Sequence, residues 1–159
     1  MPHLHILRDS REKKPWLFDD FDASVSDETI NTGDYTLAEL CRHDPEKDTY
    51  YPRYSIERKS GSDFLSSITS GRERFKREIK RATDWESPLL VVIEESRSNF
   101  KHNRGSMQYR NLTSSQGFGT VTEWEKYYNV AFRFARTRNV AQEITYNNLQ
   151  AALGRELIL

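Results

Sequence analysis

Two stretches decide the fold: Tyr54-Ser55-Ile56-Glu57-Arg58-Lys59 and Leu89-Leu90-Val91-Val92-Ile93. The first is rich in aromatic and β-branched residues, which favours a strand. The second is continuously apolar, as expected of a strand that is covered on both faces. Between them, apolar residues recur at helical spacing from about Asp63 to Thr83, with Ser62 as the expected N-cap. This order predicts a crossover that returns to a parallel neighbouring strand.

The rest of the chain predicts an α/β fold around a central mixed sheet, because strand patterns alternate with helical patterns. Further strands are expected at Leu4 to Leu7, Trp16 to Phe18, Tyr35 to Leu40 and Asn129 to Phe134, and a helix at Asn139 to Glu156. Loops are expected at Arg42 to Asp48 and at Ser96 to Gly119, the second followed by a short helix from near Thr120 or Thr122. No repeat or composition shift divides residues 1–159, so we expect one domain.

Composition excludes several classes of protein. Cys41 is the only cysteine, which rules out an intramolecular disulfide and a thiolate zinc site. The N-terminus does not resemble a signal peptide, and no apolar run approaches the roughly 20 residues that cross a bilayer. The 24 basic and 24 acidic residues cancel, which by itself does not indicate a nucleic-acid binder. The acids, however, crowd the first half of the chain, and bases cluster later, in Arg72 to Arg81, Lys101 to Arg110 and Arg133 to Arg138.

The informative polar residues are Asp34, Glu57 and Lys59. Residues i and i+2 of a strand project from the same face, so Glu57 and Lys59 should lie about 7 Å apart along the strand. If Asp34 opens the neighbouring strand, its carboxylate can converge on them. Two carboxylates can hold Mg²⁺ with open coordination sites, and a nearby lysine can orient water or stabilise phosphate charge. The pattern predicts metal-dependent phosphodiester hydrolysis.

A wider motif surrounds these residues. It comprises Gly33-Asp34, then Glu57-Arg58-Lys59-Ser60-Gly61-Ser62-Asp63, with Asp9-Ser10-Arg11-Glu12 upstream and Gly71-Arg72 and Ile93-Glu94 downstream. With this GD…ERKxxxD signature, the chain from about Leu4 to Thr145 resembles the nuclease domain of the xeroderma pigmentosum group F (XPF) family of structure-specific endonucleases.

The resemblance implies a restriction-endonuclease-like, three-layer α/β/α fold and Mg²⁺- or Mn²⁺-dependent cleavage of DNA at branches, flaps or forks. It makes Asp34 and Glu57 metal ligands, Asp9 a carboxylate that binds the metal directly or through water, and Lys59 the catalytic lysine. The supporting residues that it implies are Arg11, Glu12, Arg58 and Asp63.

The resemblance also raises an expectation about partners. Family members usually carry a tandem helix-hairpin-helix module, and many carry a helicase-like region, but neither is evident here. A homodimer or a partner that supplies branch recognition is therefore expected, with no membrane association. Location would be cytoplasmic for a prokaryotic or viral source and nuclear for a eukaryotic one.

Several alternatives stay open at this point. Asp63 fits equally well as a helix-start residue favoured by the helix dipole. Candidate DNA contacts are Arg72, Lys76, Arg97, Lys101 and Arg104, but a basic helix face is often simply its solvated side, with Glu73 and Glu78 as ion-pair partners. Rival functions are a homodimeric duplex-cutting or junction-resolving nuclease of the same fold, and a catalytically silent DNA-binding or scaffold subunit.

Overall fold

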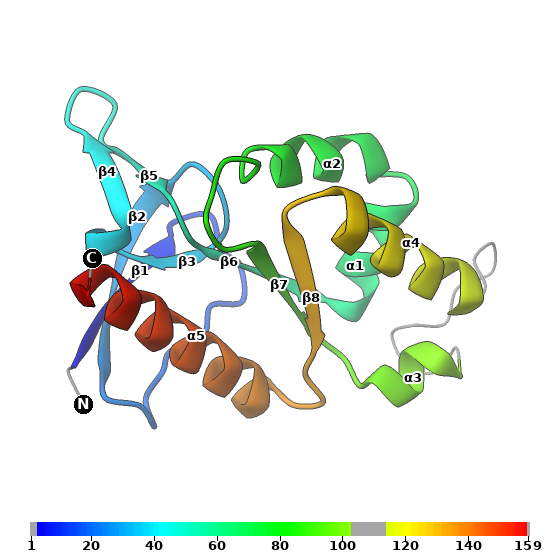
Figure 1. Cartoon of the computed structure of the whole chain (residues 1–159). Helices are drawn as coiled ribbons and strands as arrows, with labels where there is room; N and C mark the ends of the chain where they lie inside the picture. The colour runs from blue at the N-terminus through cyan, green and yellow to red at the C-terminus, as the bar shows by residue number, and fades with distance from the viewer. Residues whose placement is uncertain (1–2, 103–113, 159) are drawn as a thin grey trace.

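The computed structural model describes residues 3–102 and 114–158, with side chains at 3–102 and 116–156 (Figure 1). Within these residues a mixed sheet of eight strands runs in the order β4-β5-β2-β1-β3-β6-β7-β8. The strands are β1 (Leu4–Asp9), β2 (Ala23–Ile30), β3 (Tyr35–Leu37), β4 (Cys41–Asp44), β5 (Thr49–Pro52), β6 (Ile56–Ser60), β7 (Leu89–Glu94) and β8 (Val130–Phe134). The helices are the 3₁₀ turn η1 (Ala38–Leu40), α1 (Gly61–Ile68), α2 (Arg72–Lys80), α3 (Arg97–Lys101), α4 (Ser114–Tyr127) and α5 (Arg138–Ile158).

The sheet lies between two helical layers. In Figure 1, α5 lies across one face, and α1, α2 and α4 cover the other. The alternation of β7 divides its apolar run between two cores: Leu90 and Val92 pack in the core beneath α5, whereas Leu89, Val91 and Ile93 pack in the core with α1, α2 and α4. This arrangement confirms the three-layer α/β/α fold expected from the sequence.

The crossover predicted from the two deciding stretches is also present. β6 pairs with β7 in parallel, from Ile56 opposite Leu90 to Ser60 opposite Glu94. β3 pairs antiparallel with β6 on its other side, through Tyr35 and Ile56. β6 therefore lies in the middle of the sheet, and the residue before β3 reaches the same region as the carboxyl end of β6.

The single helix expected from Asp63 to Thr83 is wrong, because the chain breaks it into α1 and α2. Thr69 leaves the helix and its hydroxyl donates to the Leu65 carbonyl oxygen at 2.7 Å. Gly71 folds back closely enough for its amide to donate to the Ser66 carbonyl oxygen at 2.8 Å. The N-cap of α1 is also Ser60 rather than Ser62, since Ser60 Oγ accepts the Asp63 amide at 3.1 Å.

The expected strand at Trp16 to Phe18 is wrong as well. Trp16 and Phe18 are buried as a non-strand segment, in which Trp16 stacks on Tyr35 with ring centroids 4.8 Å apart. Leu17 between them is 58% exposed. Two buried aromatic residues on an irregular segment therefore produced the alternation of buried and exposed positions that is typical of a strand.

Other elements were missed because their sequences are polar. β2 lies in Ala23–Ile30, where most side chains are exposed or half-buried, and the expected loop at Arg42 to Asp48 contributes to the β4–β5 hairpin. The expected loop at Ser96 to Gly119 contains α3, and α4 begins at Ser114 rather than near Thr120.

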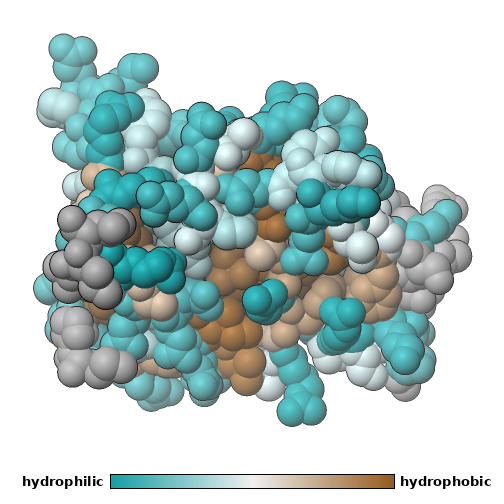
Figure 2. Space-filling model, in the orientation of Figure 1, coloured by the Kyte–Doolittle hydropathy of each residue, from teal (hydrophilic) through white to brown (hydrophobic). Residues whose placement is uncertain are grey.

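The surface in the view of Figure 2 is mostly hydrophilic, with an apolar area near its centre over the N-terminal part of α5. Val140, in this part of α5, is 39% exposed. None of the described helices combines the length and the apolar character that a bilayer-spanning helix needs.

Candidate active site

Asp34 directly precedes β3 and is held by the two strands that flank it, β1 and β6. Its amide donates to the Ile56 carbonyl oxygen at 2.8 Å, and its own carbonyl oxygen accepts the Asp9 amide at 2.7 Å. Its carboxylate accepts the Arg58 amide at 2.8 Å. These bonds tie Asp34 to the carboxyl end of β1 and to the first half of β6, beside Glu57.

Gly33 makes this close approach feasible. Its φ of 81° lies in the left-handed region that side chains disfavour. A Cβ atom there would lie 2.8 Å from the Cβ atom of Ser55, on the segment that leads into β6. The Ser55 hydroxyl in turn donates to the Thr32 carbonyl oxygen at 2.7 Å. Glycine is thus required both by the backbone and by the lack of space.

The predicted polar residues surround one hollow of about 630 Å³. We call it the carboxylate hollow; it is lined by the predicted residues Asp9, Arg11, Glu12, Asp34, Glu57, Arg58, Lys59 and Asp63, and also by Lys13, Lys14, Ser60, Ser62 and Arg74. All the catalytic and supporting residues expected from the sequence therefore lie together, although they come from three separate segments of the chain.

The two central acids are perturbed by burial and by each other. Glu57 is only 6% exposed, and Asp34 is partly accessible at the hollow. Burial raises the pKa of Asp34 to about 6, against the opposite effect of hydrogen bonds from the Glu57 carboxyl and the Arg58 amide. Burial, the charge of Asp34 and hydrogen bonds to Asp34 and Glu78 raise the pKa of Glu57 well above its ordinary value. Two negative charges in one desolvated site repel each other, and a bound cation would offset this repulsion.

The donor set of this hollow fits Mg²⁺ or Mn²⁺. Within the described ranges, no group of three or more His, Cys, Asp and Glu side chains is arranged to hold an ion by itself. Mg²⁺, however, commonly uses only one or two carboxylates and keeps several waters beside substrate phosphates. Asp34 and Glu57 provide such a pair. The oxygens of Asp9 already accept the Ile30 amide at 3.3 Å and Arg11 Nε at 3.0 Å, which suits contact through water better than direct ligation.

Arg58 points away from solvent into an ion-pair network. Its side chain is 6% exposed, and its Nε and Nη2 atoms donate to the two oxygens of Glu94 at 2.7 and 3.1 Å. Glu12 accepts from Arg58 Nη1 at 3.4 Å, and Arg138 Nη1 donates to Glu94 at 3.2 Å. Trp16 Nε1 also donates to Glu94. Arg58 therefore orients β6 and the Asp34 carboxylate rather than facing the hollow with a free guanidinium.

Lys59 and Asp63 lie at the edge of the hollow. Lys59 Nζ lies 4.7 Å from the centroid of the Phe75 ring, which holds it beside Glu57 on the same face of β6. Asp63 lines the hollow and also lies in the first turn of α1, where Ser60 caps its amide. The supporting and helix-start roles expected for Asp63 are thus compatible with one position.

Three residues in α2 or directly after it, which sequence reasoning did not assign to the site, also face it. Arg74, Glu78 and Arg81 line a continuation of the hollow, about 350 Å³ in volume, together with Asp34 and Glu57. Their spacing of four and three residues places them on one helix face. Glu78, which the sequence suggested as a surface ion-pair partner, is hydrogen-bonded to Glu57 instead. Only the position of α2 against the sheet distinguishes this face from the others.

The predicted DNA contacts lie elsewhere. Arg72 Nη1 donates to the Ile68 carbonyl oxygen at 3.2 Å, and its guanidinium lies 4.9 Å from the Trp124 ring centroid. Lys76 pairs with Glu73 at 3.8 Å. Arg97 stacks 4.7 Å from the Phe118 ring centroid, and Lys101 is exposed at the end of α3.

These four bases do not line either hollow described above. Their contact with DNA stays a prediction, and Arg104 lies outside the described residues.

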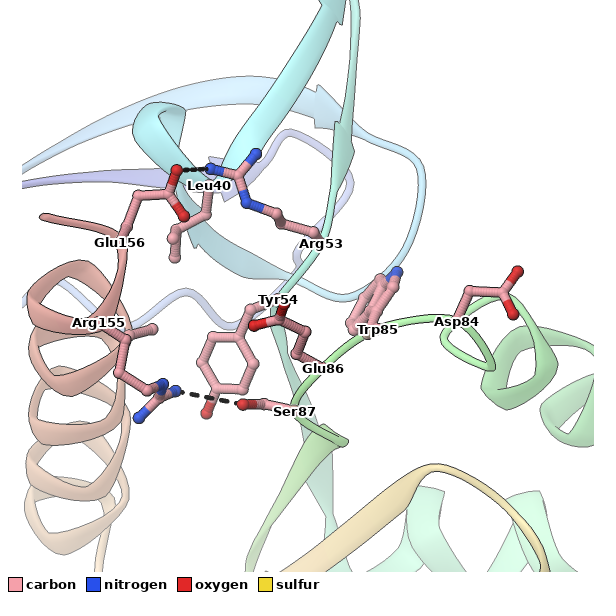
Figure 3. Close-up of a pocket in the computed structure, with 10 residues that line it drawn as sticks. Leu40, Arg53, Tyr54, Asp84, Trp85, Glu86, Ser87, Arg155 and Glu156 are labelled. Atoms are coloured by element: carbon pink, nitrogen blue, oxygen red, sulfur yellow. Dashed lines mark hydrogen bonds and ion pairs between the residues drawn. The ribbon is translucent and has the colours of Figure 1, made fainter. Parts of the chain in front are cut away.

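A separate hollow of about 270 Å³ lies at the C-terminal end of α5 (Figure 3). Arg53 pairs there with Glu156, and Arg155 donates to Ser87 Oγ at 3.3 Å. Burial raises the pKa of Tyr54, on its floor, to about 12. Arg53 and Arg155 therefore already interact with other residues of the chain. These interactions connect α5 to the loops before β6 and β7.

Comparisons with known proteins identify a family and a similar fold. A family model described as the ERCC4 domain matches residues 8–148. Among solved structures, XPF from Aeropyrum pernix superposes with a TM-score of 0.67 at 15% sequence identity. That match covers 92% of this chain but 65% of the other, so the present chain spans less than two thirds of its length. A comparison with curated proteins yields no significant match. The family match extends over most of the chain and includes the carboxylate hollow, and the chain thus belongs to the ERCC4 domain family, the XPF family of nucleases.

Proposed function

We propose that the protein is a Mg²⁺- or Mn²⁺-dependent endonuclease that hydrolyses phosphodiester bonds in branched, flap or fork DNA. The observation that carries the proposal is the convergence of Asp34 and Glu57, beside Lys59, in one hollow. Family membership supports the nuclease activity. The metal is supported by the donor set and by the raised pKa values of the two acids, because a cation would offset their mutual repulsion.

Each residue has a distinct part in this reaction. Asp34 and Glu57 would hold the cation, and the Arg58 amide keeps Asp34 directed toward the hollow. A bound divalent cation lowers the pKa of coordinated water and offsets charge on the phosphate. Lys59 stabilises negative charge on the same phosphate or orients the attacking water. Asp9 and Arg11 support the far wall, and Glu12, Arg58 and Glu94 hold β6 rigid beneath it.

The preference for branched DNA rests on the family alone. We propose that a second copy of the chain or a partner contributes to branch recognition. A duplex-cutting or junction-resolving homodimer and a silent scaffold remain the rival functions. The presence of all the acids in one hollow favours catalysis over the scaffold.

The decisive experiment compares cleavage of end-labelled flap, fork, four-way junction and duplex DNA in Mg²⁺, Mn²⁺ and EDTA. Asp34→Asn and Glu57→Gln should each lose more than the roughly 100-fold that removal of an outer-shell partner costs. Asp20→Asn serves as the matched control, because Asp20 is exposed and does not line the described hollows. Cleavage by Asp34→Asn at the wild-type rate would refute the proposal, and the ranking of substrates separates the rival nucleases.

A further inference from the structure

Another hollow adjoins the carboxylate hollow and extends it along the protein. It has a volume of about 360 Å³ and shares Lys59, Asp63 and Arg74 with the carboxylate hollow. Its remaining wall comes from the end of α1, the turn between α1 and α2, and α2 itself: Ser66, Ser67, Ser70, Gly71, Phe75 and Glu78. We call it the α1–α2 hollow. A chain of phosphates entering one hollow can therefore continue into the other past Arg74.

Arg74 is held in this place by the packing of α2. Phe75 and Ile79 on α2 are 2% and 1% exposed in the core, so the helix cannot rotate without exposing them. Beyond its C-terminal end, Arg81 Nη1 donates to the Asn31 carbonyl oxygen at 3.1 Å. One turn after Arg74, Glu78 is hydrogen-bonded to Glu57. Residues four apart on a helix have Cβ atoms about 5–6 Å apart, which places Arg74 beside the central acids.

The guanidinium of Arg74 is free to bind a ligand. It is exposed, and within the part of the chain that the structure describes it has neither a hydrogen-bond nor an ion-pair partner. The other arginines of the carboxylate hollow differ in this respect, since Arg11 pairs with Asp9 and Arg58 with Glu94. An unpaired guanidinium with hydroxyl groups nearby matches the forked geometry by which arginine binds phosphate oxygens.

We infer that Arg74 binds a backbone phosphate of the DNA strand next to the phosphate that is cleaved, where the strand passes from the carboxylate hollow into the α1–α2 hollow. The inference rests on the proposed nuclease function for its ligand, a nucleic-acid strand. It assigns the strand a path over α2 and the α1–α2 turn, and not toward the face that carries Arg72 and Lys76.

The test measures binding without cleavage. Fluorescence anisotropy of labelled single-stranded and flap DNA in EDTA is recorded over a range of salt concentrations for wild type, Arg74→Ala, Arg74→Lys and Arg77→Ala. Arg77 is the matched control, because it is exposed on the same helix but lines none of the three hollows. Circular dichroism confirms that each variant is folded.

Arg74→Ala should weaken binding about tenfold at low salt. The slope of log K against log salt should fall by about 0.7 to 0.9, the value of one lost phosphate contact. Arg74→Lys should retain most of the slope, and Arg77→Ala should match wild type. Equal behaviour of Arg74→Ala and Arg77→Ala, or a lack of DNA binding by wild type, would overturn the inference.

Cleavage in Mg²⁺ separates this inference from the proposed function. A wild type that binds through Arg74 but does not cut would leave the phosphate site standing and remove the nuclease proposal. If wild type cuts DNA and Arg74→Ala is unchanged in both binding and KM, the nuclease proposal stands and the inference about Arg74 is overturned.

Discussion

Replacement of Gly33 by alanine tests the backbone geometry that presents Asp34. At a φ of 81°, a residue with a Cβ atom pays roughly 1–2 kcal/mol for the left-handed conformation. The new Cβ would also lie 2.8 Å from Ser55 Cβ, and forcing an extra carbon into a packed place costs about 1–3 kcal/mol. Together these effects predict a loss of about 2–5 kcal/mol in the free energy of unfolding.

The loss is large against a typical stability of about 5–15 kcal/mol. Urea unfolding, followed by tryptophan fluorescence, should show a lower midpoint with an unchanged m-value. At about 2–4 °C per kcal/mol for a chain of this size, the melting temperature should fall by roughly 4–20 °C. Cleavage should fall as well, because Asp34 moves with the turn.

A double-mutant cycle separates the two causes. Ser55→Gly removes the atoms that the new methyl group meets but leaves the backbone strain at position 33. The two substitutions should therefore couple favourably, by about 1–3 kcal/mol. A cost below about 1 kcal/mol for Gly33→Ala, or independent effects of the two substitutions, would refute this account of the turn.

Three further predictions follow from the ionisable groups. Arg58→Ala should cost about 3–5 kcal/mol in urea unfolding, because it leaves Glu94 and Glu12 without their buried partner, whereas Arg77→Ala should stay within about 0.5 kcal/mol of wild type. Since the pKa of Asp34 is raised from 3.8 to about 6, the folded state binds the extra proton between these values, and the stability that this group contributes is lost as pH rises through about 6. Mg²⁺ needs the ionised carboxylate, so it should raise the melting temperature at pH 8 but not at pH 4.5; an equal shift at both pH values would contradict the assignment. Burial raises the pKa of the Cys41 thiol to about 11, so alkylation by iodoacetamide at pH 8 should be roughly 100-fold slower in the folded protein than in urea, and comparable rates would show that the thiol is not shielded.

The sequence by itself determined those parts of the protein whose signals are local. β7 is recognisable because a strand that is covered on both faces is continuously apolar, and β6 because aromatic and β-branched residues lead into it. The parallel crossover between them follows from the helical pattern that separates them. The motif from Gly33-Asp34 to Asp63 identified the family, and the residues that it named do lie around one hollow. Their roles in catalysis still await the tests above.

Only the tertiary structure decided what depends on neighbours distant in the chain. β2 is a strand because β1 and β5 pair with it, although its own side chains are mostly polar. Arg72 and Arg74 are equally basic in the sequence. Packing of Phe75 against the core turns Arg74 toward the acids and leaves Arg72 stacked on Trp124. The side chains of a helix point in all directions around its axis. The packing of α2 against the sheet determines which of them face the site.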